Sequence, residues 1–381
     1  MAGIGSAVAT SKAAESATPS SAPPTAYDSF QRILPHIGDI GRLVAAEGRA
    51  NAAGDESALI PREAVMECDA AQEYVEAYGW AVVDAGGSPD AARDDANMVA
   101  YHVHTFANHE LHRRKTFWVD PPLAWMLAQT KLDIDGELLR LPFPACAFVF
   151  TDPETLAIAK ELLAVDRTVG DQRSSPKVVT VYLQQPAADG RPRPLSVCAY
   201  LDRLTDDWPY LLGRDLLVDP RARIDEILDS HFPDVDPTVR DEVFTSAPMK
   251  RLLHLVINAV LYATSAGVVP MLIRSPLGAA KAPKPGTRKR SQQRELDRER
   301  RRRTSEDVFF LPGKIDIRQV QQLQEMETGA AGRALMARFM VRGHWRRANA
   351  TWEDQRTRWI EPYWKGPELA AVIEREYRLK T

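Results

Sequence analysis

The stretch LRLPFPACAFVF, residues 139–150, decides the fold class because its second half is an uninterrupted apolar run of β-strand length. Prolines near its start interrupt the backbone before that strand begins. Two further short apolar runs have the same character, KVVTVYL at 177–183 and the segment 195–201. With helical segments before, between and after them, these strands indicate an α+β protein with a helix-rich body and a small sheet, antiparallel or mixed.

The segments before the first strand have apolar residues at helical spacing. The sequence predicts a short helical region at 27–47 that is broken by Gly48, and then helices at 61–79, 86–114 and within 117–132. Asp120-Pro121-Pro122 is a start signal for the last of these helices, since proline is tolerated in the first turn.

Residues 252–273 form the longest uncharged stretch, and its 22 residues are enough to cross a bilayer. Polar side chains within the stretch argue against a membrane span. Gly267 and Pro270 would also stop a helix before the end of the stretch. We therefore expect a buried helix of about four turns, followed by a short extended segment.

Composition divides the chain into four parts. Residues 1–26, rich in Ala, Ser, Thr and Pro, are expected to be a disordered leader, and 27–273 the α+β body. Residues 274–305, dominated by proline, glycine and basic residues, are expected to be a flexible linker. Residues 306–381 would form a basic and aromatic C-terminal module, with order restarting at 308–312, a helix at 317–326, and 334–347 leading into a strand.

The net charge of −3 hides an asymmetry along the chain. Residues 281–381 contain 24 Lys and Arg against 14 Asp and Glu, which leaves 25 against 38 for residues 1–280. An acidic body with a basic tail suggests that the tail meets a polyanion or the acidic surface of the body itself.

The three cysteines, Cys68, Cys146 and Cys198, are far apart and have no paired spacing. They encode neither a disulfide framework nor a four-cysteine zinc site, and they fit a reducing cytoplasm. No glycine-rich phosphate loop or nucleophile elbow occurs, so the sequence predicts no cofactor.

Arginine and tryptophan alternate in the tail, in VRGHWRR at 341–347 and RTRWIEPYWKG at 356–366. Successive side chains of a strand point to opposite faces, so Arg342, His344 and Arg346 would share one face and Trp345 the other. The second run repeats the device with Arg356 and Arg358 opposite Thr357 and Trp359. Two such strands predict a hairpin with a basic, aromatic face.

This hairpin supplies the candidate binding residues, and three interpretations of them stay open. Exposed arginines and aromatic rings can contact phosphates and stack on bases, which would indicate RNA or the ribosome. They can equally contact a protein, or the aromatic residues can belong to the core while the arginines are solvated. The candidates are Arg342, His344, Trp345, Arg346, Arg356, Arg358, Trp359, Tyr363 and Lys365, with Gly343, Trp345 and Trp359 as the structural signature.

The linker offers a second polyanion-binding candidate, although solvated disorder is the simpler interpretation. Its basic clusters would bind phosphates without sequence selectivity. They comprise Arg288, Lys289, Arg290, Arg300, Arg301, Arg302 and Arg303.

Arg342-Gly343-His344-Trp345, followed by Arg356-x-Arg358-Trp359, resembles the C-terminal signature of a family of type V-A anti-CRISPR proteins and their relatives in mobile elements. The order of weaker features is similar as well: a Leu-Pro strand entry at 141–142, an apolar helix, a basic linker and the aromatic segment at 308–310. The leader, the arginine-dense linker and the ending at 363–366 depart from that pattern.

The resemblance implies a non-enzymatic regulator that binds the nascent or N-terminal segment of a target polypeptide and lowers the expression of that polypeptide. A CRISPR effector nuclease is the target that the resemblance suggests. The basic tail would then contact RNA or the ribosome. The alternative from another class is a DNA- or RNA-binding accessory protein of a mobile element.

An enzyme is the third hypothesis, and it depends on four histidines within 102–112. Imidazole is a common zinc ligand, but His102 and His104 would point apart on a helix, and HELH lacks the histidine spacing of zinc peptidases. The sequence therefore predicts no metal site, with His104, Asn108 and His112 as a polar stripe on an ordinary helix surface. His344 as a catalytic base has no nucleophile or second acid near it in the sequence.

Overall fold

The structure is a computed structural model. It describes residues 37–51, 58–84, 86–165, 176–202, 210–232, 247–274, 307–312, 339–341, 343–349, 351–361 and 363–365. Four parts of the chain named above lie outside the described residues: the leader at 1–26, the linker beyond Arg274, the helix expected at 317–326, and Arg342.

A mixed sheet of seven strands, in the order β5-β4-β3-β2-β1-β7-β6, forms the centre of the molecule. β1 runs parallel to both β2 and β7, and the other neighbours are antiparallel. The strands are β1 (Thr116–Val119), β2 (Ala145–Phe150), β3 (Val178–Gln184), β4 (Arg193–Asp202), β5 (Tyr210–Val218), β6 (Met271–Arg274) and β7 (Asp307–Leu311). The α+β class and the mixed sheet are confirmed, but the sheet is larger than the sequence predicts.

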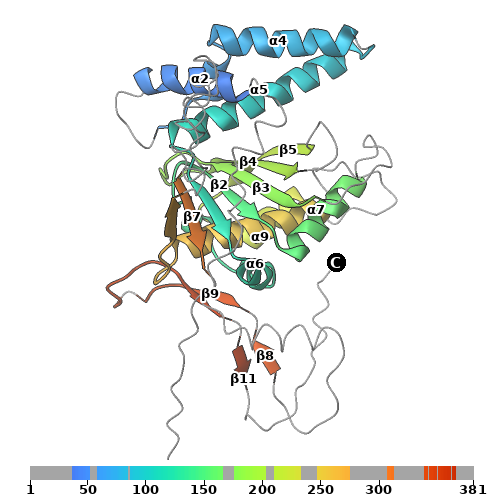
Figure 1. Cartoon of the computed structure of the whole chain (residues 1–381). Helices are drawn as coiled ribbons and strands as arrows, with labels where there is room; N and C mark the ends of the chain where they lie inside the picture. The colour runs from blue at the N-terminus through green and yellow to red at the C-terminus, as the bar shows by residue number, and fades with distance from the viewer. Residues whose placement is uncertain are drawn as a thin grey trace, which may run out of the picture.

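Helices cover both faces of this sheet (Figure 1). One face has α2 (Ile37–Asn51), α3 (Arg62–Val65), α4 (Asp69–Asp84) and α5 (Pro89–Leu111). The core beneath α5 contains Val103 and Phe106 of the helix and Trp118, Tyr182 and Tyr200 of the sheet.

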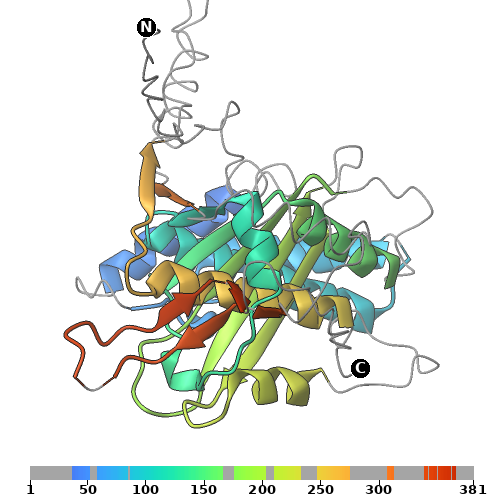
Figure 2. The same cartoon turned by 90° about the horizontal axis from the view of Figure 1, so that it is seen from below.

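The opposite face is covered by α6 (Pro121–Ala128), α7 (Pro153–Val165), α8 (Ile224–His231) and α9 (Ala247–Thr264), with the 3-10 turn η1 (Gly136–Leu138) between α6 and β2. α9 is buried along almost its whole length and crosses the sheet (Figure 2). The buried helix and following extended segment expected within 252–273 are thus α9 and β6. None of the described helices has both the length and the apolarity that a membrane crossing requires.

The C-terminal strands lie beyond α9, on the side away from the sheet (Figures 1 and 2). β9 (His344–Arg346) pairs antiparallel with β10 (Arg358–Ile360), and β8 (Phe339–Val341) pairs with β11 (Tyr363–Lys365). The predicted hairpin is therefore present. β7 also lies within 306–381, yet it is a strand of the central sheet between β1 and β6.

One predicted helix begins where the sequence places it, and two others have different bounds in the structure. The helix expected within 117–132 is α6, which begins after Asp120 at the predicted proline signal, and the residues just before it, 116–119, form β1. The helix predicted at 61–79 is two helices, because the chain turns at 66–68 between α3 and α4. α2 continues through Gly48, where a Cβ would lie 2.6 Å from the side chain of Ile60. Gly48 permits close packing there and does not end the helix.

Candidate functional site

The β9–β10 hairpin places its alternate residues as the sequence predicts. Trp345 lies opposite Trp359, and Arg346 lies opposite Arg358. Trp345 is buried and Arg346 and Arg358 are exposed. The hairpin therefore has an inner face of tryptophans against the body and an outer face of arginines.

Both tryptophans of the inner face donate hydrogen bonds to the body. Trp345 is 8% exposed, and its Nε1 donates to Oδ1 of Asn258 on α9 over 2.8 Å. Nε1 of Trp359 donates to Oγ1 of Thr130 over 3.3 Å, and its ring meets Tyr262 edge to face with centroids 5.2 Å apart. Trp345 thus belongs to the core of the body, and the partly buried ring of Trp359 packs against that core.

Asn258 joins the hairpin to the end of α6. It is fully buried within an apolar helix, and its Nδ2 donates to the carbonyl of Thr130 over 3.1 Å. Because its Oδ1 accepts from Trp345 at the same time, both ends of the amide have partners. Asn258 is one of the polar side chains within the uncharged stretch 252–273, and its position in the sequence does not predict this role. The signal that could have revealed its role is one amide among buried apolar positions.

The backbone of the hairpin also bonds to the body on each side. The N–H of Lys131 donates to the carbonyl of Gly343 over 3.2 Å, and the N–H of Ala266 donates to the carbonyl of Thr357 over 2.8 Å. Gly343 and Thr357 are buried. The hairpin is thus fixed by loops that follow α6 and α9 as well as by its two indoles.

The outer face gathers cations around one more aromatic ring. The guanidinium carbon atoms of Arg346 and Arg358 lie 5.0 and 4.3 Å from the centroid of the Trp352 ring. Two like charges on directly opposite strand positions repel each other, and the negative face of an indole offsets part of that repulsion. Trp352 lies between the two runs of alternating residues, and the sequence pattern does not predict it as a site residue.

Arg356 forms an exposed, two-pronged ion pair with Asp354. Its Nε and Nη2 donate to the two carboxylate oxygens over 3.1 and 2.9 Å. The hydrogen bonds from Arg356 lower the pKa of the Asp354 carboxyl to about 2. Arg356 is therefore less free to contact a ligand than Arg346 or Arg358 are.

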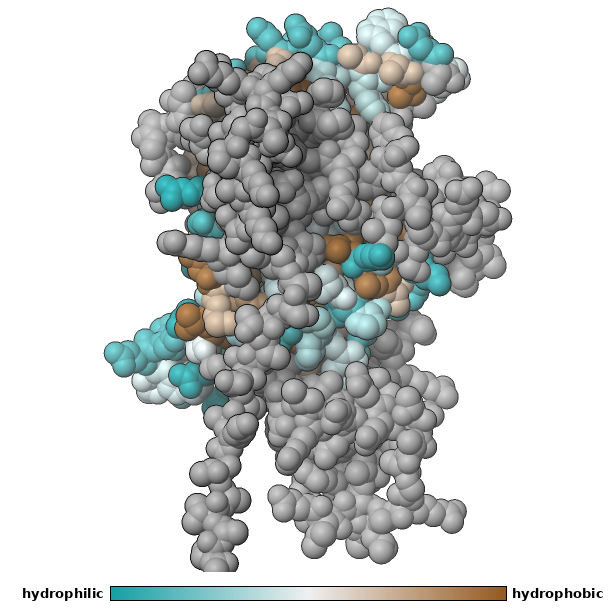
Figure 3. Space-filling view, in the orientation of Figure 1, coloured by the Kyte–Doolittle hydropathy of each residue, from teal (hydrophilic) through white to brown (hydrophobic). Residues whose placement is uncertain are grey.

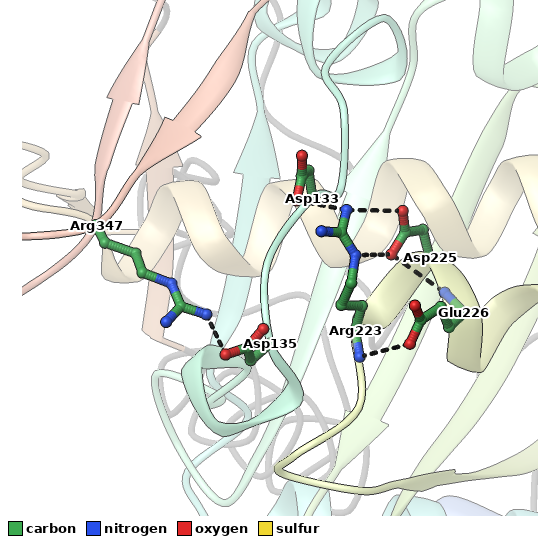
Figure 4. Close-up of polar contacts among 6 residues, drawn as sticks. All are labelled: Asp133, Asp135, Arg223, Asp225, Glu226 and Arg347. Atoms are coloured by element: carbon green, nitrogen blue, oxygen red, sulfur yellow. Dashed lines mark hydrogen bonds and ion pairs between the residues drawn. The ribbon is translucent and has the colours of Figure 1, made fainter.

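Arg347, the residue after β9, extends the attachment of the hairpin to the loop between α6 and η1 (Figure 4). It forms an ion pair with Asp135. Two residues earlier in the same loop, Asp133 pairs with Arg223, whose Nε also donates to Asp225 over 3.2 Å at the start of α8. These ion pairs connect the hairpin through the loop to α8, and no sequence pattern predicts them.

The remaining tail candidates divide into two groups. His344 is partly buried opposite Ile360. Tyr363 and Lys365 pair with β8 through their backbones, but their side chains are outside the description, as are Arg342 and all the linker candidates. The structure thus brings together Trp345, Arg346, Arg358 and Trp359, and it leaves the role of the others as predictions.

The histidine-containing stripe of α5 is not an ordinary helix surface, which corrects that prediction. His104 is 8% exposed and Asn108 is fully buried. Nε2 of His104 lies 2.8 Å from the carbonyl oxygen of Ile60, and Oδ1 of Asn108 accepts from the N–H of Ile60 over 2.8 Å. His112 contacts the carbonyl oxygen of Ala58 over 3.1 Å. The stripe therefore holds the backbone of 58–60 against α5.

Burial shapes the chemistry of the other histidines and cysteines. Desolvation lowers the pKa of His102 to about 4 and that of His109 to about 3, and it raises the pKa of the Cys198 thiol to about 12. These groups stay neutral near pH 7 and are enclosed by protein. In the described part of the chain, no three His, Cys, Asp or Glu side chains are placed to hold a metal ion.

The fold and the site define an α+β protein in which a basic C-terminal hairpin is docked on the buried helix of a mixed sheet. The chain belongs to the AcrVA2-like family, anti-CRISPR type V subtype A2, whose model matches residues 117–366. A crystal structure of AcrVA2 is similar at 11% sequence identity and a TM-score of 0.43, over 88% of this chain and 96% of that one. No curated protein in the comparison matches the chain.

Proposed function

We propose that this anti-CRISPR family member binds the nascent or N-terminal segment of a target polypeptide, such as a CRISPR effector nuclease, and lowers its production. The hairpin would contact RNA or the ribosome during that process. Family membership supports the general role, and the division of the hairpin into two faces supports the part assigned to the tail.

The observation that carries this proposal is the cluster of Arg346, Arg358 and Trp352 on the outer face. Here two guanidinium groups are held near a partly exposed indole. Cations supply phosphate contacts and aromatic rings supply stacking platforms, the two components of sequence-tolerant binding to single-stranded nucleic acid.

The test compares two double variants in a reporter assay. Arg346→Gln with Arg358→Gln removes the cations of the outer face, and Arg93→Gln with Arg251→Gln removes two exposed arginines from the helices on either side of the sheet. The reporter is fused to the N-terminal segment of a type V-A effector nuclease. We expect the hairpin variant to fold normally and to lose repression, and the control variant to repress like the wild type.

Affinity for RNA gives a second measurement. The slope of log affinity against log salt changes by about 0.7 for each phosphate contact with a single strand, so the hairpin variant should have a slope smaller by about 1.4. An unchanged slope together with full repression would show that the arginines are bystander surface.

The alternative of a nucleic-acid-binding accessory protein predicts a different result in the same system. Capture of the target polypeptide should survive nuclease treatment if the body binds the peptide itself. If nuclease releases every captured partner, nucleic-acid binding is the primary activity.

A further inference from the structure

The two edges of the central sheet are protected to different degrees. β5 carries Arg214 and Asp215 within the strand, and charged residues discourage pairing with another chain. The hydroxyl of Tyr101 bonds to the carbonyl of Arg214 and to the carboxylate of Asp215, both at 3.2–3.3 Å. The guanidinium of Arg214 packs over Phe232 after α8. This edge is charged, and Tyr101 and Phe232 contact its charged residues.

β6, the strand at the other edge, has none of these protections along its first half. Val269 just before the strand is 77% exposed, and Met271 and Leu272 within it are 51% and 56% exposed. Apolar surface gathers where Figure 1 places β6 and β7, as the space-filling view shows (Figure 3). An apolar edge strand of this kind is a template for a further strand.

Among the described residues, the backbone of β6 also has a partner strand on one side only. β6 pairs with β7 on one side only, from Met271 opposite Phe310 to Arg274 opposite Asp307. In an antiparallel pair, alternate residues direct their N–H and C=O groups away from the partner. No backbone hydrogen bond joins the outer side of β6 to another described residue.

We propose that β6 receives an extended, uncharged and apolar segment of the target polypeptide as an eighth strand of the sheet. This inference rests on the proposed function, and it names the place where the polypeptide binds. A nascent or N-terminal segment is suited to such pairing because its backbone groups are not yet engaged in a fold. Backbone bonds would supply the affinity, and Met271 and Leu272 would select apolar side chains.

The size of the edge favours a peptide over a second copy of the chain. β6 has four residues, whereas stable association of two proteins buries about 1,200–2,000 Å² of surface. A peptide needs a smaller buried area, since a second contact between the same two partners raises the effective concentration of the peptide at the edge. A hairpin that touches the ribosome would provide that second contact while the nascent chain emerges.

The experiment uses the full chain and fluorescently labelled overlapping peptides that cover the N-terminal segment of a type V-A effector nuclease. Leu272→Lys places a charge on the edge, and Leu217→Lys is the matched control, because Leu217 is also 56% exposed and lies on the opposite edge strand. We expect Leu272→Lys to weaken peptide binding at least about tenfold, which corresponds to about 1.4 kcal/mol of binding free energy, and Leu217→Lys to leave it unchanged. Circular dichroism checks that both variants fold.

Methylation of single peptide nitrogens gives a signature specific to strand addition. Only alternate peptide N–H groups would face β6, so binding should fall at every second methylated position and persist at those between. Equal binding by wild type and Leu272→Lys would overturn the edge site and leave the proposed function standing. If the wild type binds none of the peptides, both fail. Dimerisation that Leu272→Lys abolishes, without peptide binding, would assign the edge to a second copy and refute our proposal.

Discussion

Replacement of Trp345 by alanine should be among the most destabilising changes in the hairpin. The indole is 8% exposed, and removal of a buried tryptophan side chain costs about 3–5 kcal/mol. The change also deprives Oδ1 of Asn258 of its donor in a fully buried position, where an unsatisfied group costs about 1–3 kcal/mol. We therefore expect Trp345→Ala to lower the free energy of unfolding by about 4–5 kcal/mol. Trp345→Phe should cost about 1–3 kcal/mol, because it keeps most of the packing and loses the hydrogen bond.

Urea unfolding followed by circular dichroism measures the global effect, and hydrogen exchange measures docking of the hairpin. The amides of Lys131 and Ala266 report on docking because they donate to the hairpin backbone. Trp80→Ala is the control, since Trp80 is 69% exposed and its removal should cost less than about 0.5 kcal/mol. If Trp345→Ala matches this control in both unfolding and exchange, the hairpin is not docked as described.

Two other predictions concern charge. Burial lowers the pKa of His109 from 6.5 to about 3, so in acid the unfolded chain binds a proton that the folded chain does not. The contribution of His109 to the free energy of unfolding should therefore be fully present above pH 6.5. It should fall between pH 6.5 and pH 3 by up to about 1.4 kcal/mol per pH unit. His109→Leu should reduce the change of unfolding free energy with pH, as measured by urea unfolding. If the slope of unfolding free energy against pH is unchanged in this variant, the prediction is wrong. In the linker, glutamine at 300–303 should leave the melting temperature nearly unchanged and reduce the salt dependence of RNA affinity; equal salt slopes would exclude a role in polyanion binding.

The hairpin could be predicted because its information is local. Alternation of arginine and tryptophan over a few residues is enough to assign the two faces, and the observed register of Trp345 opposite Trp359 agrees with it. What the sequence could not provide was the partner of the inner face. Asn258 is 87 residues away from Trp345, and no periodicity links the two.

β1 shows the opposite case. Thr116–Val119 is a short apolar run, and a run of that length is compatible with a strand or with the first turn of a helix. Its strand conformation depends on parallel pairing with β2 and with β7, where Trp118 lies opposite Phe310. Because such pairing joins distant segments, the local sequence did not predict this strand.

The error over the histidine stripe has a different physical origin. His104 and Asn108 are polar and spaced for one helix face, which usually means exposure to solvent. Here the backbone of Ile60 lies over them and supplies the hydrogen-bond partners that allow burial. A polar stripe with the capacity to bond a passing backbone is therefore compatible with a core position.

The position of β7 has a consequence for how this protein is made. β1 cannot obtain its second neighbour until Val308 and the residues around it have been synthesised, nearly 200 residues later than Thr116. Until then the aromatic residues of β1 border an incomplete sheet, and a contact of such long sequence separation forms slowly because the loop must first close. We expect chain elongation and not helix formation to set the time at which this protein becomes native, and truncated chains that end before β7 to be prone to aggregation.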